Sequence, residues 1–124
     1  MKTKTIKAKS YHNIPTGYTG IVKWEGKENK GDVSYYQEGL LHRDDGPAEI
    51  TVSGIGKVEI WNNHGRIHRA DGPAIVHDNG EKEFFLYNDN YPDEDEYWEV
   101  AWKLFQDDPI KGPRIMAKML ARKK

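Results

Sequence analysis

A ten-residue segment occurs twice in this chain, and its recurrence limits the folds that the chain can adopt. The segments Gly39 to Ala48 and Gly65 to Ala74 are 26 residues apart and share seven residues at matching positions: Gly, His, Arg, Asp, Gly, Pro and Ala. A fixed period of this length is typical of a repeat architecture, in which each unit is one small supersecondary element stacked on the next. We therefore expect similar units placed side by side.

Turn residues between strand-like runs predict that each unit is a β-hairpin. Asn79-Gly80 separates residues 74–78 from residues 81–87, and Asn-Gly favours a type I′ turn with positive φ at both central positions. The matching pair one period earlier is Ser53-Gly54, where the nearby Gly56 indicates a looser turn or a bulge. A more degenerate unit begins near Pro15, so hairpin repeats are expected over residues 15–91.

Aromatic residues follow the same period. Tyr35, Trp61 and Tyr87 are each 26 residues apart. Stacked hairpins would place them along one face of the sheet, where side chains on neighbouring strands pack together. We expect a ladder of these three rings.

The repeated polar residues are interpreted as structural rather than catalytic, because the same set occurs twice at one spacing. Proline fixes φ, glycine permits unusual dihedrals, and aspartate can bind nearby backbone amides, so these residues suit the connections between hairpins. Each arginine is expected to pair with the aspartate two positions later. The residues of this structural set are His42, Arg43, Asp45, Gly46, Pro47, His68, Arg69, Asp71, Gly72 and Pro73.

The period changes after the repeats. Trp98, Ala101, Trp102 and Phe105 lie at helical spacing, and Asp93 followed by Glu96 resembles a capping box, which predicts a helix over residues 92–106. A shorter, weakly docked basic helix or tail is expected over residues 110–124, with Ile115, Met116, Met119 and Leu120 as its apolar stripe. The predicted fold is α+β and a single domain over residues 1–124: an antiparallel β-meander of tandem hairpins, with one or two C-terminal helices packed on or capping the sheet.

The charge distribution is uneven although the net charge is only −1. Residues 1–9 carry four Lys and residues 110–124 carry six Lys or Arg, so residues 10–109 hold the other 9 basic residues and all 20 acidic residues, a net of −11. An acidic body with basic ends suggests either solubility with flexible tails or a charged surface that meets a partner. The absence of cysteine fits a reducing intracellular compartment, and no apolar run approaches the roughly 18 residues that span a membrane.

The aromatic-x-x-x-Gly-x-x-His-Arg-x-Asp-Gly-Pro-Ala pattern resembles tandem hairpin repeats of bacteriophage and prophage proteins, which are similar in style to MORN repeats. The resemblance covers about Pro15 to Trp98, and the third unit departs from it because Asn88 to Pro92 lacks the His-Arg-x-Asp-Gly-Pro-Ala segment. It implies a phage-type protein in the cytoplasm of a bacterial host. It implies no activity, since the pattern is specific for the repeat and not for a reaction.

Three classes of function are weighed from these features. The leading hypothesis is a non-catalytic module that binds a host or phage protein through an acidic surface, such as an inhibitor of a host defence nuclease. The first alternative is a nucleic-acid-binding accessory protein that uses the basic termini, and the second is a small metal-dependent enzyme that uses the His-Arg-x-Asp turns. We predict no cofactor, no metal and no catalytic residue, and a homodimer remains open. The candidate partner-binding residues are Asp89, Asp93, Glu94, Asp95, Glu96, Glu99, Lys111, Arg114, Lys118 and Arg122.

Overall fold

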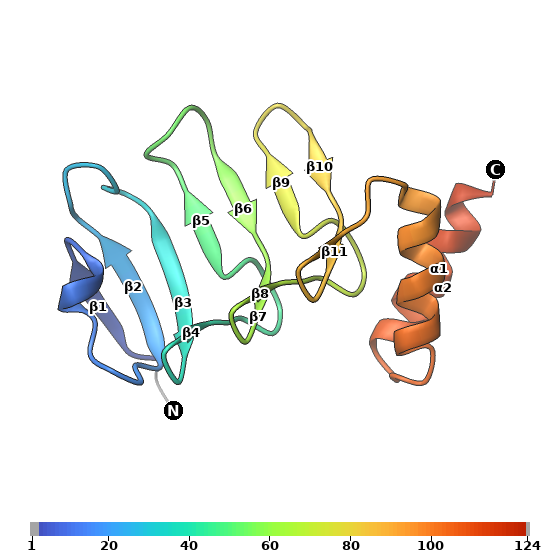
Figure 1. The fold of residues 1–124 in the computed structure, drawn as a ribbon, viewed down its shortest axis with the longest axis horizontal. Helices are drawn as coiled ribbons and strands as arrows, with labels where there is room; N and C mark the ends of the chain where they lie inside the picture. Colours follow the sequence, from blue (N-terminus) through green and yellow to red (C-terminus); the bar gives the residue numbers. More distant parts are fainter. Residues whose placement is uncertain (1–2, 124) are drawn as a thin grey trace.

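The chain folds into one long, mostly antiparallel sheet followed by two helices, the α+β arrangement predicted from the repeats (Figure 1). The structure is a computed structural model and describes residues 3–123; the basic residues Lys2 and Lys124 lie outside this range. The main sheet has the strand order β1-β2-β3-β5-β6-β9-β10, and β4 pairs with the end of β3. These strands are β1 (Thr5–Ala8), β2 (Gly20–Trp24), β3 (Val33–Gln37), β4 (Leu40–Leu41), β5 (Glu49–Thr51), β6 (Val58–Ile60), β9 (Ile75–His77) and β10 (Lys82–Glu83).

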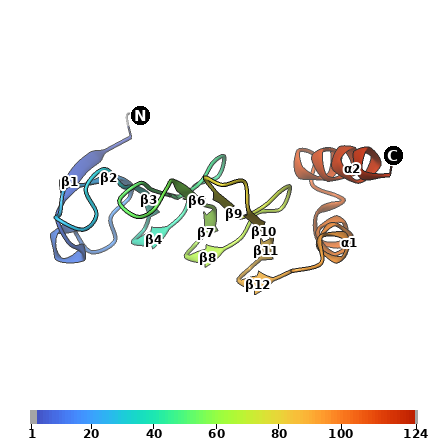
Figure 2. The same cartoon turned by 90° about the horizontal axis from the view of Figure 1, so that it is seen from above.

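Two further ladders and three helices complete the fold. β7 (Asn62–Asn63) pairs with β8 (Arg66–Ile67), and β11 (Phe85–Leu86) pairs with β12 (Asp89–Asn90). A 3₁₀ turn (Tyr11–Asn13) follows β1, and α1 (Glu94–Phe105) and α2 (Lys111–Arg122) end the chain. Both α-helices lie at one end of the sheet, and neither covers the central strands (Figure 2).

The basic N-terminal segment is a strand rather than the flexible tail considered above. β1 pairs in parallel with β2, with Thr5 opposite Ile21 and Ala8 opposite Trp24. Ala8, Val22 and Trp24 are buried together with Tyr18 in a small apolar cluster at this end of the sheet. The sheet therefore begins ten residues before the first hairpin that the sequence indicates at Pro15.

Each unit contains two hairpins that alternate along the chain. The long hairpins are β2–β3, β5–β6 and β9–β10; the short hairpins are β3–β4, β7–β8 and β11–β12. The turns of the short hairpins have positive φ at both central residues, which is the type I′ signature: Glu38-Gly39 (50° and 84°), His64-Gly65 (46° and 85°) and Tyr87-Asn88 (48° and 72°).

The turn predicted at Asn79-Gly80 exists, but its predicted type is wrong. Gly80 has a φ of 91°, while Asn79 is not among the residues with positive φ. The Gly80 amide donates to the His77 carbonyl and the His77 amide donates to the Glu81 carbonyl, the pattern of a type I turn closed by a left-handed glycine. The Asn79 side-chain oxygen accepts the Glu81 amide (2.9 Å), which stabilises this turn.

The aromatic ladder is also shifted from its predicted register. The amides of His42, His68 and Tyr91 donate to the carbonyls of Tyr35, Trp61 and Phe84, so these three aromatic residues hold equivalent positions. The third unit is three residues shorter than the second, with 23 residues from Trp61 to Phe84 against 26 from Tyr35 to Trp61. The loops of the long hairpins shrink in the same order, from residues 25–32 to 52–57 to 78–81. Tyr87 therefore lies in a turn and Phe84 takes the ladder position.

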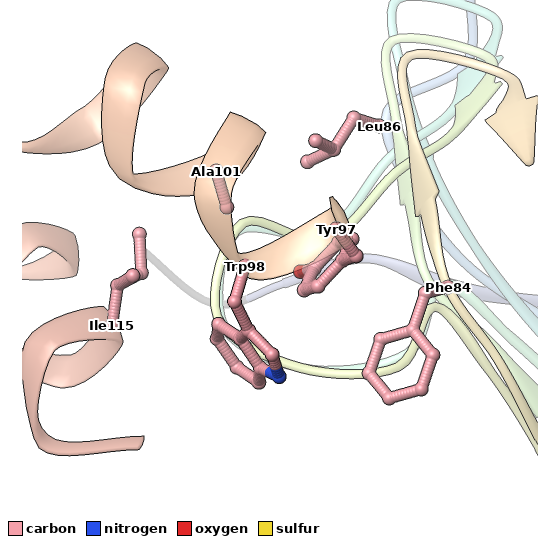
Figure 3. Close-up of a cluster of buried hydrophobic side chains, with 6 residues drawn as sticks. All are labelled: Phe84, Leu86, Tyr97, Trp98, Ala101 and Ile115. Carbon is pink, nitrogen blue, oxygen red and sulfur yellow. The ribbon is translucent and has the colours of Figure 1, made fainter. Parts of the chain in front are cut away.

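The second apolar cluster lies where the array meets the helices (Figure 3). Phe84, Leu86, Tyr97, Trp98, Ala101 and Ile115 are all buried and pack together. Trp98 and Ala101 belong to the predicted stripe, whereas Trp102 and Phe105 are only half-buried and Tyr97, which the stripe omits, is fully buried. The helix thus presents a face rotated slightly from the expected one.

The basic C-terminal segment forms a full helix, contrary to the shorter and weakly docked element that we expected. α2 has 12 residues, as many as α1, and its Ile115 is fully buried against α1. Gly112 explains the close approach of the connection: a Cβ there would lie 2.6 Å from the Gln106 carbonyl oxygen. Of the predicted stripe, Leu120 is exposed.

Candidate functional site at the repeat connections

Each repeated histidine binds the turn of the next short hairpin. His42 Nδ1 accepts the amide of His64 and His68 Nδ1 accepts the amide of Tyr87, both at 3.0 Å. Each imidazole also contacts the ring of the residue that donates to it: the His42 and His64 rings are tilted with centroids 4.1 Å apart, and the His68 and Tyr87 rings are stacked at 3.9 Å. In the first unit Thr19 Oγ1 accepts the Glu38 amide in the same way (2.8 Å). The histidines hold adjacent units together.

Each repeated arginine folds back over its own unit. Nη1 of Arg43 donates to the Pro47 carbonyl and Nη1 of Arg69 donates to the Pro73 carbonyl, both at 3.1 Å. The guanidinium groups cover the ladder aromatics, 4.0 Å from the Tyr35 ring centroid and 3.8 Å from that of Trp61. Such cation–π contacts stabilise the folded chain most where water is excluded.

The repeated glycines are needed for space and not for an unusual dihedral, which corrects our interpretation. Neither Gly46 nor Gly72 has positive φ. A Cβ at Gly46 would lie 2.7 Å from the Arg43 guanidinium carbon, and one at Gly72 would lie 2.8 Å from that of Arg69. The missing side chain lets the arginine pass over the backbone.

The predicted pairing of arginine with aspartate occurs in the second repeat only. Arg69 Nε donates to Asp71 Oδ1 at 3.3 Å, as expected, and Arg114 of α2 also donates to Asp71 at 3.3 Å. Within residues 3–123 neither Asp45 nor Asp71 accepts a backbone amide, and Arg43 makes no ion pair with Asp45. The prediction that these aspartates cap backbone amides is therefore wrong for both repeats.

The two connections differ at one position with a chemical consequence. His42 Nε2 donates to Asp44 Oδ1 at 2.7 Å, whereas Ala70 stands at the matching position of the second repeat. His68 Nε2 is buried and has no hydrogen-bond partner within the described residues. Burial, together with Lys111 and Arg66, lowers the pKa of His68 to about 4, so the ring is neutral at pH 7. Because Nδ1 accepts a hydrogen bond, the single proton of the neutral ring is on Nε2.

A cavity of about 120 Å³ lies between the two connections and the start of α2. His68 and Ala70 line it from the second repeat, Asp44 and Asp45 from the first, and Lys111 and Arg114 from α2. The sequence reasoning grouped Lys111 and Arg114 with an external surface. The structure places them against the repeat connections instead.

The acidic candidates are divided by α2. Glu94 and Asp95 both accept from the Arg122 guanidinium, and Asp93 caps α1 by accepting the amides of Asp95 and Glu96. Asp89, Glu96 and Glu99 are exposed and form no ion pair within residues 3–123. These three residues are named the open acidic group below.

The basic candidates of α2 lie along one side of that helix. Lys111, Arg114, Lys118 and Arg122 follow helical spacing, and two of them are in ion pairs, Arg114 with Asp71 and Arg122 with Glu94 and Asp95. β1, which carries Lys7, lies at the opposite end of the elongated sheet (Figure 1). The two basic ends of the chain therefore do not form one continuous surface.

Tyr97 is a central residue that the sequence reasoning missed. Its hydroxyl accepts the Gly72 amide (3.1 Å) and lies within hydrogen-bond distance of the carbonyl oxygens of Gly72 (2.9 Å) and Arg69. Burial raises its pKa well above the usual tyrosine value. It begins the helical face that also contains Trp98 and Ala101, and a search for the buried face allowing a one-residue shift would have found it.

These features define a class of protein by architecture: an uncovered sheet of tandem hairpins closed by a two-helix end. No protein-family model, curated protein or solved structure matches the chain. Among residues 3–123 no cluster of three His, Asp or Glu side chains is placed to hold a metal ion. Likewise, neither helix of the described chain has the length and apolar character needed to cross a membrane.

Proposed function

We propose that this protein is a non-catalytic binding module that engages a basic surface of another protein through the open acidic group. The observation that carries the proposal is the division of the acidic residues by α2. Arg122 neutralises Glu94 and Asp95, whereas Glu96 and Glu99 stay exposed and unpaired within the described residues.

Helical geometry supports a shared role for these two carboxylates. Glu96 and Glu99 are three residues apart in α1, so they are neighbours on one helix face. The buried residues Tyr97, Trp98 and Ala101 lie on the other side of α1, packed on the array. A rigid, exposed pair of like charges on an anchored helix favours a partner of opposite charge, which it attracts over roughly one Debye length of about 8 Å at physiological salt.

The acidic excess of the body supports a basic partner as a whole. Residues 10–109 carry a net charge of −11, which speeds association with a cationic protein surface. The resemblance of the repeats to phage and prophage proteins supports a partner in the cytoplasm of a bacterial host. A defence nuclease is a fitting target, because its nucleic-acid groove is basic and an acidic protein can occupy it.

Charge reversal tests the proposal. The variant Glu96→Lys/Glu99→Lys should lose a partner that the native protein retains from a bacterial lysate, while the matched control Glu28→Lys/Glu81→Lys, with the same change in net charge at exposed loop positions, should keep it. Retention of the native protein's partner should weaken as salt rises from about 50 to about 500 mM, because salt screens the attraction between exposed charges.

Two results would contradict the proposal. Equal retention by both variants would remove the open acidic group from the interface. Recovery of nucleic acid instead of protein, lost on nuclease treatment and reduced by Lys118→Gln/Lys123→Gln, would favour the nucleic-acid-binding alternative.

A further inference from the structure

The second repeat connection contains an unpaired donor where the first contains a hydrogen bond between His42 and Asp44. In the first repeat His42 Nε2 donates to Asp44 at 2.7 Å, with the His42 side chain 5% exposed. In the second repeat Ala70 replaces that aspartate, and His68, which is 6% exposed, keeps a buried Nε2–H that has no acceptor among residues 3–123. An unsatisfied buried donor is unfavourable, so such groups call for an explanation.

Ala70, which stands at the position of the absent carboxylate, borders the cavity already described. Both His68 and Ala70 line this space, whose volume of about 120 Å³ is several times the roughly 15 Å³ that one water requires. Lys111 and Arg114 of α2 line it as well. The cavity beside His68 thus has a cationic wall.

The net charge of the cavity lining favours a ligand with a single negative charge. Four cationic side chains border the cavity: Arg43, Arg69, Lys111 and Arg114. Three carboxylates border it too, Asp44, Asp45 and Asp71, of which Asp71 is held by Arg69 and Arg114. The net charge of these side chains is +1. One monoanion neutralises it, whereas a phosphate dianion would leave an excess negative charge.

We propose that this cavity is a binding site for a carboxylate group, which accepts the His68 Nε2–H and takes the place that Asp44 takes in the first repeat. Lys111 and Arg114 supply the charge attraction. The site lies on the repeat connections rather than on the open acidic group, so it stands independently of the proposed function.

The source of the carboxylate is either a small organic acid or a carboxylate of a polypeptide, and the chemistry at His68 is the same for both. Acetate, an N-acetylated glutamate amide and a tripeptide with a free C-terminus serve as the three probes. The probe that binds most tightly identifies the source of the carboxylate. A polypeptide carboxylate binds only if the cavity also admits the chain atoms attached to it.

Nuclear magnetic resonance of the imidazole nitrogens measures binding directly. In ¹⁵N-labelled full-length protein at pH 7, acetate should shift the His68 Nε2 resonance in a saturable manner, whereas sodium chloride at equal ionic strength should not. The exposed His12 serves as an internal reference. Bound carboxylate should also raise the pKa of His68 from about 4, because it favours the charged ring.

Two variants place the site. Ala70→Asp supplies the carboxylate from the chain itself, so the His68 resonance should move as acetate moves it and the response to acetate should disappear. Lys111→Gln keeps the backbone hydrogen bond of the helix start to Asp108 but removes one charge, and should weaken acetate binding about tenfold. If Ala70→Asp does not fold, the comparison of native protein with Lys111→Gln decides the matter.

The proposal is overturned if chloride and acetate shift His68 equally, which would mean a general effect of salt. It is also overturned if phosphate binds more tightly than every carboxylate probe, or if Ala70→Asp folds and still responds to acetate as the native protein does.

Discussion

At the scale of single residues, the conformation of each residue in the repeated motif depends on its neighbours in that motif. The arginine covers an aromatic ring and donates to the carbonyl of the proline four residues on, and the glycine between them leaves space for the guanidinium. The recurrence of identical residues at one spacing predicted a structural role for them. The reason for the glycine could not be predicted, because it depends on where the arginine folds.

Adding a methyl group at Gly72 tests whether the glycine is needed to leave space for the Arg69 side chain. Gly72→Ala should lower the free energy of unfolding by about 1–3 kcal/mol, since its Cβ would lie 2.8 Å from the Arg69 guanidinium carbon and overpacking carries that cost. Gly54→Ala is the matched control, because nothing lies within 4 Å of its Cβ and its φ is ordinary. Urea denaturation of both variants measures the difference, and equal stability of the two would contradict the spatial role of Gly72.

His68 should make stability depend on pH. Its pKa is about 4 in the folded protein against about 6.5 in an unfolded chain, so the unfolded chain binds more protons between these values. Stability is therefore full above pH 6.5 and falls as pH drops toward 4, by up to about 3 kcal/mol. His68→Asn, whose side-chain oxygen can still accept the Tyr87 amide, should lose this part of the pH dependence, whereas His12→Asn should retain it. Urea midpoints from pH 4 to 7 give the comparison, and parallel curves for native and His68→Asn proteins would refute it.

At the scale of elements, α1 is attached to the array by Tyr97. The hydroxyl contacts the backbone of the second connection at Arg69 and Gly72, in a part of the chain 25 or more residues earlier. The ring itself packs on Phe84, with centroids 4.8 Å apart. One side chain thus joins the helix to two successive units.

Removal of that hydroxyl should loosen the helix from the sheet. Tyr97→Phe leaves the buried Gly72 amide without its acceptor and should destabilise the protein by about 1–3 kcal/mol. Tyr91→Phe is the control, since the Tyr91 hydroxyl forms no hydrogen bond within residues 3–123. Thermal unfolding followed by circular dichroism compares them. Equal melting temperatures for Tyr97→Phe and Tyr91→Phe would show that packing alone holds α1.

Local patterns predicted the elements that depend on local physics. The helical spacing from Trp98 to Phe105 and the cap at Asp93 located α1 to within two residues, because a helix is set by neighbours along the chain. β1 was missed because a four-residue strand that pairs in parallel with β2 leaves no turn between them to detect. The ladder was misassigned at Tyr87 because a 26-residue register does not show that the third unit is shorter by three residues.

The candidate site depended even more on contacts distant in sequence. The sequence identified His68, Lys111 and Arg114, but not that α2 places the last two beside the first. The change from Asp44 to Ala70 was visible as a mismatch in the repeat. Its meaning required the hydrogen bond between His42 and Asp44, which no spacing rule supplies.

At the scale of the whole molecule, the described chain has two separate apolar clusters and a thin sheet between them. One cluster contains Val22 and Trp24 near the N-terminus, and the other contains Trp98 and Ile115 near the C-terminus. The central strands β5, β6 and β9 contain half-buried side chains and join the two ends. Stability should therefore resemble a sum over neighbouring units, as in repeat proteins, rather than the property of one shared core.

Additivity of core mutations tests this arrangement. Val22→Ala should cost about 2 kcal/mol and Ile115→Ala about 2–5 kcal/mol, since each removes methyl groups from a fully buried site. Because the two residues belong to different clusters, the double variant should equal the sum within about 0.5 kcal/mol. Trp98→Phe with Ile115→Ala, in one cluster, should instead show a coupling of about 0.5–3 kcal/mol. Urea denaturation of all single and double variants supplies both values. A Val22–Ile115 coupling as large as that of Trp98 with Ile115 would mean that the ends unfold as one body, and that the sheet transmits packing changes along its whole length.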